Sequence, residues 1–316
     1  MINADKPERW KDDIWASVDQ YNQWFLGAAP RAYRETRTST AGSVLEAFAA
    51  TNNLRGITPD VLALDPGILP TLRMSTAPPI ARDRLSGLSE VPKTLVKSME
   101  DGRIPPQMAK TTLMRHLQSM CTTLNDLLDV DLYPWLADGT PHDSHQLELA
   151  TAVVADRLCR SLTDPIIKNA QEQRQLAVIT DWLERRGYRQ QAHPPREPLQ
   201  SMAPGTFSFR MNVLTGDSDH TVNIPIDAVI QPHTPLPHGL PILVEAKSAG
   251  DFTNTNKRRK EEATKVRQLR ATYGEDIALL LFLCGYFDAG YLGYEAAEGL
   301  DWVWEHRIDD MAEAGA

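Results

Sequence analysis

Two acidic residues and a lysine lie at spacings that suit phosphodiester hydrolysis. Glu245 and Lys247 end the apolar run "PILVEAKS", and Asp227 lies at the centre of a second apolar run, "IPIDAVI". Side chains alternate across a strand, so Glu245 and Lys247 project from the same face. Seventeen residues separate Asp227 from Glu245, which is enough for a turn and a return strand. A hairpin would place the two carboxylates side by side.

Two converging carboxylates repel each other, and a hard divalent cation such as Mg²⁺ relieves the repulsion because it binds oxygen ligands. Lys247 beside such a cation can orient or deprotonate a water and can neutralise charge in the transition state. Hydrolysis of a phosphodiester needs both, because negative charge develops in it. The alternative is a strand-end Glu245 paired with Lys247, with Asp227 as an ordinary carboxylate near a turn.

A helix expected at about residues 165–186 carries a further acidic residue. Leu176, Ile179 and Leu183 form one apolar stripe, and Glu172 lies on the same stripe, four residues before Leu176. Glu172 is either a supporting or second-metal carboxylate that faces the sheet, or a solvated residue favoured by the helix dipole.

The segment "TNTNKRRKEEATKVRQLRATYG" begins a charged helix with four cations. Cations at a helix N-terminus oppose the helix dipole, so they indicate a role other than stability. With the exposed N–H groups they form an anion site, and we expect contact with the DNA backbone. A solvated face, supported by the pair Glu261 and Lys265, is the alternative. The candidate DNA-binding residues are Asn254, Asn256, Lys257, Arg258, Arg259 and Lys260.

A second candidate for DNA binding is the stretch "RDRLSGLSEVPKTLVKSMEDGRIP" at residues 82–105, which is compatible with a helix-turn-helix. Lys93, Thr94 and Lys97 would then lie on the exposed face of a recognition helix and meet phosphates or base edges. Glu90 replaces the small residue usual in the turn. Any two short amphipathic helices give a similar pattern, so a plain helical scaffold is the alternative. The apolar positions of the two helices are Leu85, Leu88, Val91, Val96 and Met99.

The elements that must position these residues change in character at about residue 160. In residues 1–160 the apolar residues recur every three or four positions, which predicts a mainly helical region. Residues 161–316 predict a helix, three strands, a helix, a strand and a helix. Because "DIALLLFLC" is apolar without alternation, its sheet is expected to be covered on both faces. We expect an α/β fold, with "DWVWEHRIDD" as an amphipathic helix that packs Trp302 or Trp304 on the sheet.

The composition excludes several classes of protein. The 316 residues carry a formal charge of −9, which argues against a general polyanion coat but allows a local basic surface. Three scattered cysteines are too few for a disulfide framework or a zinc site. No apolar stretch reaches the roughly 18 to 20 residues that span a bilayer, and the N-terminus is too polar for a signal peptide. We therefore expect a cytoplasmic protein without a membrane partner.

The motifs together resemble those of PD-(D/E)xK nucleases, with "IPID" as the first half-motif and "EAK" as the second. More narrowly, "ILVEAKSAGDFTNTNKRRKEEATK" and "NAQEQRQLAVITDWLERRGY" resemble XamI-like type II restriction endonucleases, most strongly over about residues 164–316. One departure is that Ile226, not proline, precedes Asp227. The resemblance implies a restriction-endonuclease-like core of a mixed sheet flanked by helices in residues 161–316. Residues 1–160 would serve DNA recognition or act as a scaffold.

The resemblance also implies the chemistry. Asp227 and Glu245 would bind Mg²⁺, for which Mn²⁺ would substitute, with the Ala246 carbonyl as a further ligand. Lys247 would serve the attacking water, and hydrolysis of double-stranded DNA would leave 5′-phosphate and 3′-hydroxyl ends. Targets of this class are usually short palindromes, which implies a homodimer that cuts one strand with each subunit. A cognate DNA methyltransferase is expected in the same prokaryotic cell.

Two other functions are compatible with the same residues. One is a DNA repair or structure-specific nuclease of the same fold. The other is a non-catalytic DNA-binding regulator that uses the helix-turn-helix and keeps a relict nuclease fold. An intact Asp, Glu and Lys set argues against the regulator, since a relict site has no reason to retain all three.

Overall fold

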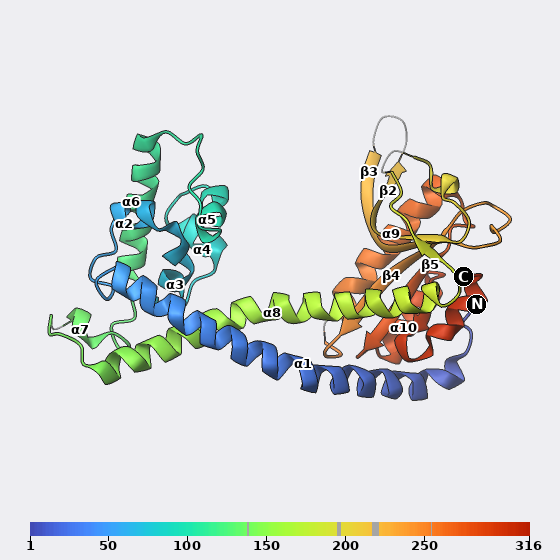
Figure 1. Ribbon diagram of the computed structural model, residues 1–316, viewed down its shortest axis with the longest axis horizontal. Helices are drawn as coiled ribbons and strands as arrows, with labels where there is room; N and C mark the ends of the chain where they lie inside the picture. The colour runs from blue at the N-terminus through green and yellow to red at the C-terminus, as the bar shows by residue number, and fades with distance from the viewer. Residues whose placement is uncertain (138, 195–196, 217–220, 254) are drawn as a thin grey trace. The chain divides into compact units, whose positions relative to one another are not determined.

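The chain forms two compact units. The computed structural model describes residues 1–316 except 138, 195–196, 217–220, 254 and the side chains of 255–259, and Figure 1 traces it. One unit is Ala29–Ile167, and the other combines Met1–Ala28 with Lys168–Ala316. Two long helices, α1 (Pro7–Ala50) and α8 (Ser144–Glu184), each contribute to both units. The sequence predicted two separate helices where α8 runs continuously through Pro165.

The unit Ala29–Ile167 is helical, as the sequence predicted. Within its described residues, the only β-structure is a single bridge between Thr76 and Leu128. Phe48, Leu72 and Leu117 are among the fully buried side chains of its core. The further helices of this unit are α2 (Pro59–Leu64), η1 (Pro66–Ile68), α3 (Leu69–Met74), α4 (Arg82–Leu88), α5 (Lys93–Glu100), α6 (Lys110–Asp126) and α7 (Pro134–Ala137).

The other unit is built on one mixed six-stranded sheet in the order β1-β2-β3-β4-β5-β6. The neighbours β2/β3 and β3/β4 are antiparallel, whereas β1/β2, β4/β5 and β5/β6 are parallel. The sequence predicted four of these strands. The bounds are β1 (Arg189–Gln190), β2 (Thr206–Gly216), β3 (Thr221–Gln231), β4 (Ile242–Ala249), β5 (Leu279–Gly285) and β6 (Asp301–Trp304), with η2 (Leu199–Ser201) between β1 and β2.

Helices cover both faces of the sheet, which explains the apolar character of β4 and β5. On one face Val244 belongs to a buried cluster with Ile179 and Leu183 of α8. On the other face Leu243 belongs to a cluster with Leu269 of α9 (Thr255–Tyr273). The helix α10 (Ala289–Ala297) and the start of α1 pack against further residues of β5 and β6. The α/β fold with a flanked mixed sheet is therefore confirmed. None of the helices in the described residues combines the length and apolar character needed to cross a membrane.

The C-terminal aromatic cluster forms a strand, and the predicted amphipathic helix is wrong. β6 pairs in parallel with the edge of β5, and a 3-10 helix, η3 (Glu305–Ala314), follows it. The side chains of Trp302 and Trp304 are both fully buried. An open strand edge offers a ladder of backbone hydrogen bonds, and aromatic and β-branched residues favour such a pleated, covered position.

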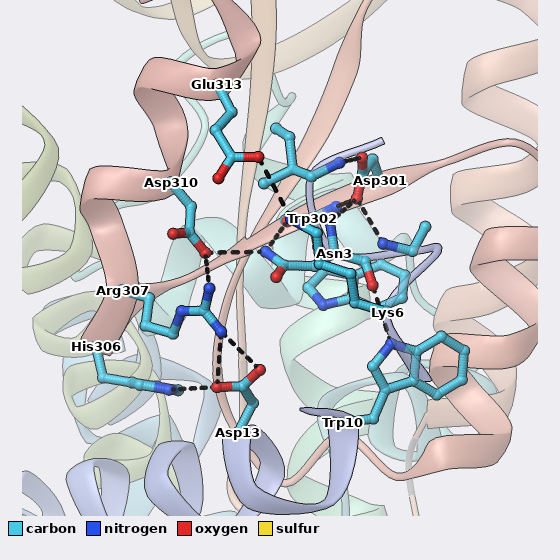
Figure 2. Close-up of polar contacts among 12 residues, drawn as sticks. Asn3, Lys6, Trp10, Asp13, Asp301, Trp302, His306, Arg307, Asp310 and Glu313 are labelled. Atoms are coloured by element: carbon cyan, nitrogen blue, oxygen red, sulfur yellow. Dashed lines mark hydrogen bonds and ion pairs between the residues drawn. The ribbon is translucent and has the colours of Figure 1, made fainter. Parts of the chain in front are cut away.

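The first residues of the chain join the sheet unit through polar contacts with its last residues, which Figure 2 shows. The carboxylate of Asp301 accepts hydrogen bonds from the backbone N–H groups of Ile2, Asn3 (2.9 Å) and Ala4 (3.0 Å). In α1, Asp13 forms an ion pair with Arg307 at 3.1 Å. The sequence placed all of residues 1–160 in one helical region, whereas these contacts tie Met1–Ala28 to the sheet.

Candidate active site

Asp227 and Glu245 meet where β3 and β4 separate. The antiparallel register runs from Ile230 opposite Ile242 to Ala228 opposite Val244, and the next residue on each strand is Asp227 or Glu245. Beyond that point the Asp227 carboxylate replaces the missing ladder contact, since its Oδ2 accepts the Ala246 N–H at 2.9 Å. Burial, followed by repulsion from Glu245, raises the pKa of Asp227 to about 6. The hairpin thus brings the two carboxylates together, as the sequence predicted.

Lys247 projects from the same face of β4 as Glu245. Its Nζ lies 3.0 Å from Glu245 Oε1 and 3.5 Å from Glu262 Oε1. Burial disfavours the ammonium ion, but the Glu245 and Glu262 carboxylates outweigh it and raise the pKa of Lys247. Lys247 is therefore protonated at neutral pH, and its side chain is 23% exposed and within reach of a ligand.

Helix α9 adds two charged residues that sequence reasoning missed. Lys265 Nζ lies 2.7 Å from Glu245 Oε1 and also donates to the Pro225 carbonyl at 2.9 Å. Glu262 is 2% exposed, and burial raises its pKa while Lys247 opposes the shift. The sequence analysis weighed Lys265 only as the partner of Glu261 on a solvated face. The signal that was available is the three-residue spacing, which puts Glu262 and Lys265 on one side of a helix.

The charges of this cluster fit a divalent cation. Both ammonium groups contact Glu245 Oε1, whereas Glu245 Oε2 is buried without a hydrogen-bond partner among the described contacts. A buried, unpaired carboxylate oxygen is costly unless it binds a cation or a donor. In the described part of the chain, no group of three or more His, Cys, Asp and Glu residues is arranged around one ion. Asp227 and Glu245 would hold a metal, and backbone carbonyls, water or substrate would complete its oxygen ligands.

Comparison with known proteins identifies the family. The XamI restriction endonuclease family matches residues 52–304, which include both carboxylates and Lys247. The chain belongs to the XamI restriction endonuclease family. It is 64% identical to the type II restriction enzyme SalI of Streptomyces albus G, over 100% of both chains. No solved structure matches the chain.

Membership of the XamI family makes the chain a type II restriction endonuclease, a site-specific deoxyribonuclease. Enzymes of this class generally use divalent metal ions. The match begins at residue 52, so the family includes most of the helical region, for which the sequence resemblance was weaker. The restriction function is thereby preferred to the repair nuclease and to the non-catalytic regulator.

Elsewhere in this XamI-family chain, Glu172 and Gln175 of α8 face the sheet. Glu172 Oε1 forms an ion pair with Arg210 of β2 at 2.7 Å, and among the described contacts it meets neither Asp227 nor Glu245. Its role as a supporting or second-metal carboxylate stays a prediction. One turn later, the carboxamide of Gln175 donates to the carbonyls of Lys247 and Phe282, both at 3.3 Å. Gln175, which the sequence analysis missed, therefore fixes β4 against β5 beside the site.

The predicted basic segment coincides with the first turns of α9, which begins at Thr255. Asn254 lies outside the described residues, and so do the side chains of Asn256, Lys257, Arg258 and Arg259. Lys260 is described and exposed. Contact of this segment with DNA stays a prediction.

The residues of the predicted helix-turn-helix form two short helices, α4 and α5. Leu85 and Met99 are fully buried, as predicted, whereas Leu88 is 51% exposed. Glu90 adopts a left-handed conformation with φ 53°, which is unusual for a residue other than glycine. The three candidate DNA contacts, Lys93, Thr94 and Lys97, are exposed, and Lys93 pairs with Asp83 at 3.2 Å. Recognition of DNA by α5 stays a prediction.

Proposed function

We propose that Asp227, Glu245 and Lys247 form the catalytic centre of this restriction endonuclease and that Mg²⁺ is its metal, with Mn²⁺ as a substitute. The observation that carries the proposal is the buried Glu245 Oε2, which lies beside Asp227 and an ammonium group and has no hydrogen-bond partner in the described part of the chain. Asp227, Glu245 and the Ala246 carbonyl would hold the ion. When bound, the ion supplies Lewis-acid stabilisation of charge on the phosphate and on the leaving oxygen.

The protonation of Lys247 defines what this residue contributes. An ammonium ion held by two carboxylates cannot take a proton from water, but it can donate hydrogen bonds. Lys247 therefore orients the attacking water and stabilises the negative charge that develops on the phosphate oxygens. The water oxygen forms a bond to phosphorus as the bond to the 3′ oxygen breaks. The attacking water releases a proton to bulk solvent, and the leaving 3′ oxygen takes up a proton from solvent. The products carry 5′-phosphate and 3′-hydroxyl ends.

The substrate and partners follow from the class of enzyme. The substrate is double-stranded DNA at a short palindromic site, and a two-fold homodimer would cut both strands. Lys260 and the preceding basic segment would contact the phosphate backbone. A cognate DNA methyltransferase would protect the host genome in the same prokaryotic cytoplasm. Sedimentation of the purified protein at micromolar concentration measures the dimer directly, and a monomer bound to palindromic DNA would contradict it.

The recognition site is proposed to be that of the SalI enzyme, because the two chains are 64% identical over their full lengths. We expect digestion of a phage genome in Mg²⁺ to give discrete bands that coincide with those of SalI. EDTA should abolish cleavage, and Mn²⁺ should restore it. Intact DNA in both Mg²⁺ and Mn²⁺ would refute the assignment, whereas discrete but different bands would refute only the shared site.

Recognition of DNA by α5 has its own test. Replacing Thr94 and Lys97 together by alanine is expected to weaken binding of the cognate duplex about tenfold or more, since a base contact contributes about 1–3 kcal/mol. Fluorescence anisotropy of labelled duplexes measures this in a Glu245→Gln background, which prevents cleavage. Lys110→Ala, on an exposed lysine of the same unit, is the control. Unchanged discrimination between cognate and scrambled duplexes would assign α5 to the scaffold.

A further inference from the structure

A buried acidic network on helices α9 and α10 lies next to Lys247. Glu262 comes from α9, and Tyr291 and Glu295 come from α10, one turn apart. The three residues are at most 2% exposed. Tyr291 Oη donates to Glu262 Oε2 at 2.9 Å, and the carboxyl group of Glu295 lies close enough to interact with that of Glu262. The other oxygen of Glu262 faces Lys247 Nζ at 3.5 Å.

The position of the negative charge in this network follows from its contacts. Two buried carboxyl groups that lie next to each other share one proton, because ionising both would leave two like charges out of water. The Tyr291 hydroxyl and the Lys247 ammonium both approach Glu262, and both stabilise a negative charge there. Glu295 is then the neutral donor, and Glu262 is the anion.

The contacts of Lys247 indicate what the Glu262 anion does. Without Glu262, the Lys247 ammonium would pair only with Glu245 and would compete with a metal ion for that carboxylate. An entering cation would also repel an ammonium that had no other counter-charge. A second, fixed anion beside the ammonium retains it in place and leaves Glu245 for the metal.

We propose that Glu262, held by Tyr291 and Glu295, is a positioning residue that keeps Lys247 directed at the scissile phosphate while Glu245 binds the metal. The inference rests on the proposed role of Lys247. Glu262 reaches neither DNA nor metal and acts only through the lysine. Supporting residues of this kind typically change rate or metal affinity by about 10- to 100-fold when they are replaced.

The test compares Glu262→Gln with Glu275→Gln, the same change at a carboxylate that is 85% exposed. We expect Glu262→Gln to lower the single-turnover rate at saturating enzyme about 10- to 100-fold. The Kd for cognate DNA in EDTA should stay within about twofold, since no DNA contact is removed. In DNA-free protein, Mn²⁺ binding measured by calorimetry should weaken several-fold. Glu275→Gln should match the wild type in all three measurements.

Graded variants examine the network behind Glu262. Glu295→Gln retains a hydrogen-bond donor, so it should lose much less rate than Glu262→Gln. Tyr291→Phe removes one donor and should cost about 3- to 10-fold in rate, measured well below the melting temperature of the variant, as one hydrogen bond to a charged group is lost. If Glu262→Gln itself destabilises the fold, the cleavage rate of Tyr291→Phe is the deciding measurement. A wild-type cleavage rate in Tyr291→Phe overturns the proposal.

A double-mutant cycle separates this inference from the proposed function. With Lys247→Ala in place, adding Glu262→Gln should cause little further loss, because Glu262 acts through the lysine. Additive losses would mean an independent role for Glu262 and overturn the inference. If Lys247→Ala alone cleaves like the wild type, the proposed role of Lys247 fails. If Lys247 is required and Glu262→Gln equals the wild type in rate and Mn²⁺ affinity, only the inference fails.

Discussion

Replacing Glu245 by glutamine is expected to lower the single-turnover rate of DNA cleavage by about a thousandfold or more. Glutamine has nearly the same shape and keeps one acceptor oxygen, but it lacks the charge that binds a metal ion. Lys247 and Lys265, which contact the same carboxylate oxygen, would also lose their shared counter-charge. Lys247→Ala should have a comparable effect, since the lysine is proposed to contact the reacting phosphate.

Binding of DNA should survive the loss of cleavage. In EDTA, Glu245→Gln is expected to bind the cognate duplex as tightly as the wild type or more tightly, because a negative charge near the phosphate backbone is removed. Anisotropy at two salt concentrations, beside quenched-flow cleavage in Mg²⁺, measures both properties. Cleavage by Glu245→Gln within tenfold of the wild-type rate would remove Glu245 from the catalytic centre. The exposed Glu275→Gln again serves as the control.

Replacing Asp227 by asparagine is expected to abolish cleavage and, in metal-free protein, to stabilise the fold. The pKa of Asp227 rises from 3.8 to about 6 on folding, so the folded state binds the proton more tightly than the unfolded state. Stability contributed by this group therefore falls as the pH rises from about 3.8 to 6. Asparagine cannot ionise but still accepts the Ala246 N–H. At pH 7.5 the variant should be more stable by about 1–3 kcal/mol.

The pH dependence and the metal dependence make this expectation specific. The stability gain of Asp227→Asn over the wild type should shrink below pH 6 and vanish below about pH 3, where the wild-type carboxyl group is protonated in both states. Adding Mg²⁺ should raise the melting temperature of the wild type but not that of the variant, because a ligand that binds only the folded state stabilises it. Thermal melts in EDTA and in Mg²⁺ at paired pH values measure both effects. A stability difference that is independent of pH would show that Asp227 is not the titrating group.

The opposition between stability and activity has a physical origin. Asp227 and Glu245 are placed together in a partly buried site before any cation is present, so their repulsion is stored in the folded chain. Lys265 and Lys247 offset part of it by pairing with one oxygen of Glu245. Among the residues that the structure describes, the remaining oxygen of Glu245 has no hydrogen-bond partner, and a metal ion is the group that would relieve the repulsion.

Patterns within one element were readable from the sequence. Alternation along β4 put Glu245 and Lys247 on one face, and the unbroken apolar run of β5 indicated a sheet covered on both sides. The spacing between Asp227 and Glu245 was sufficient to predict a hairpin, because local chain geometry limits how the strands return. The apolar stripe of α8, with Leu176, Ile179 and Leu183, is buried as predicted.

Contacts between distant segments were not readable. Trp302 and Trp304 lie in a strand because β6 pairs with the edge of the sheet at β5. Ile2 and Asn3 are held by hydrogen bonds from their backbone N–H groups to Asp301. Helix propensity and apolar spacing describe neighbours along the chain, whereas these contacts join residues about 20 to 300 positions apart. For the same reason the sequence assigned residues 1–28 to the helical region.

The sequence by itself determined the family and indicated the chemistry that we propose for it, which rests on two carboxylates and a lysine on adjacent strands. The tertiary structure decided which other charges share the site. The sequence offered Lys265 only as the partner of Glu261 on a possible solvated face and did not single out Glu262. Only the packing of α9 on the sheet turns Glu262 and Lys265 towards Lys247 and Glu245. The direction of a helix face is set by what the helix buries, here Val266 and Leu269, and that depends on the whole fold.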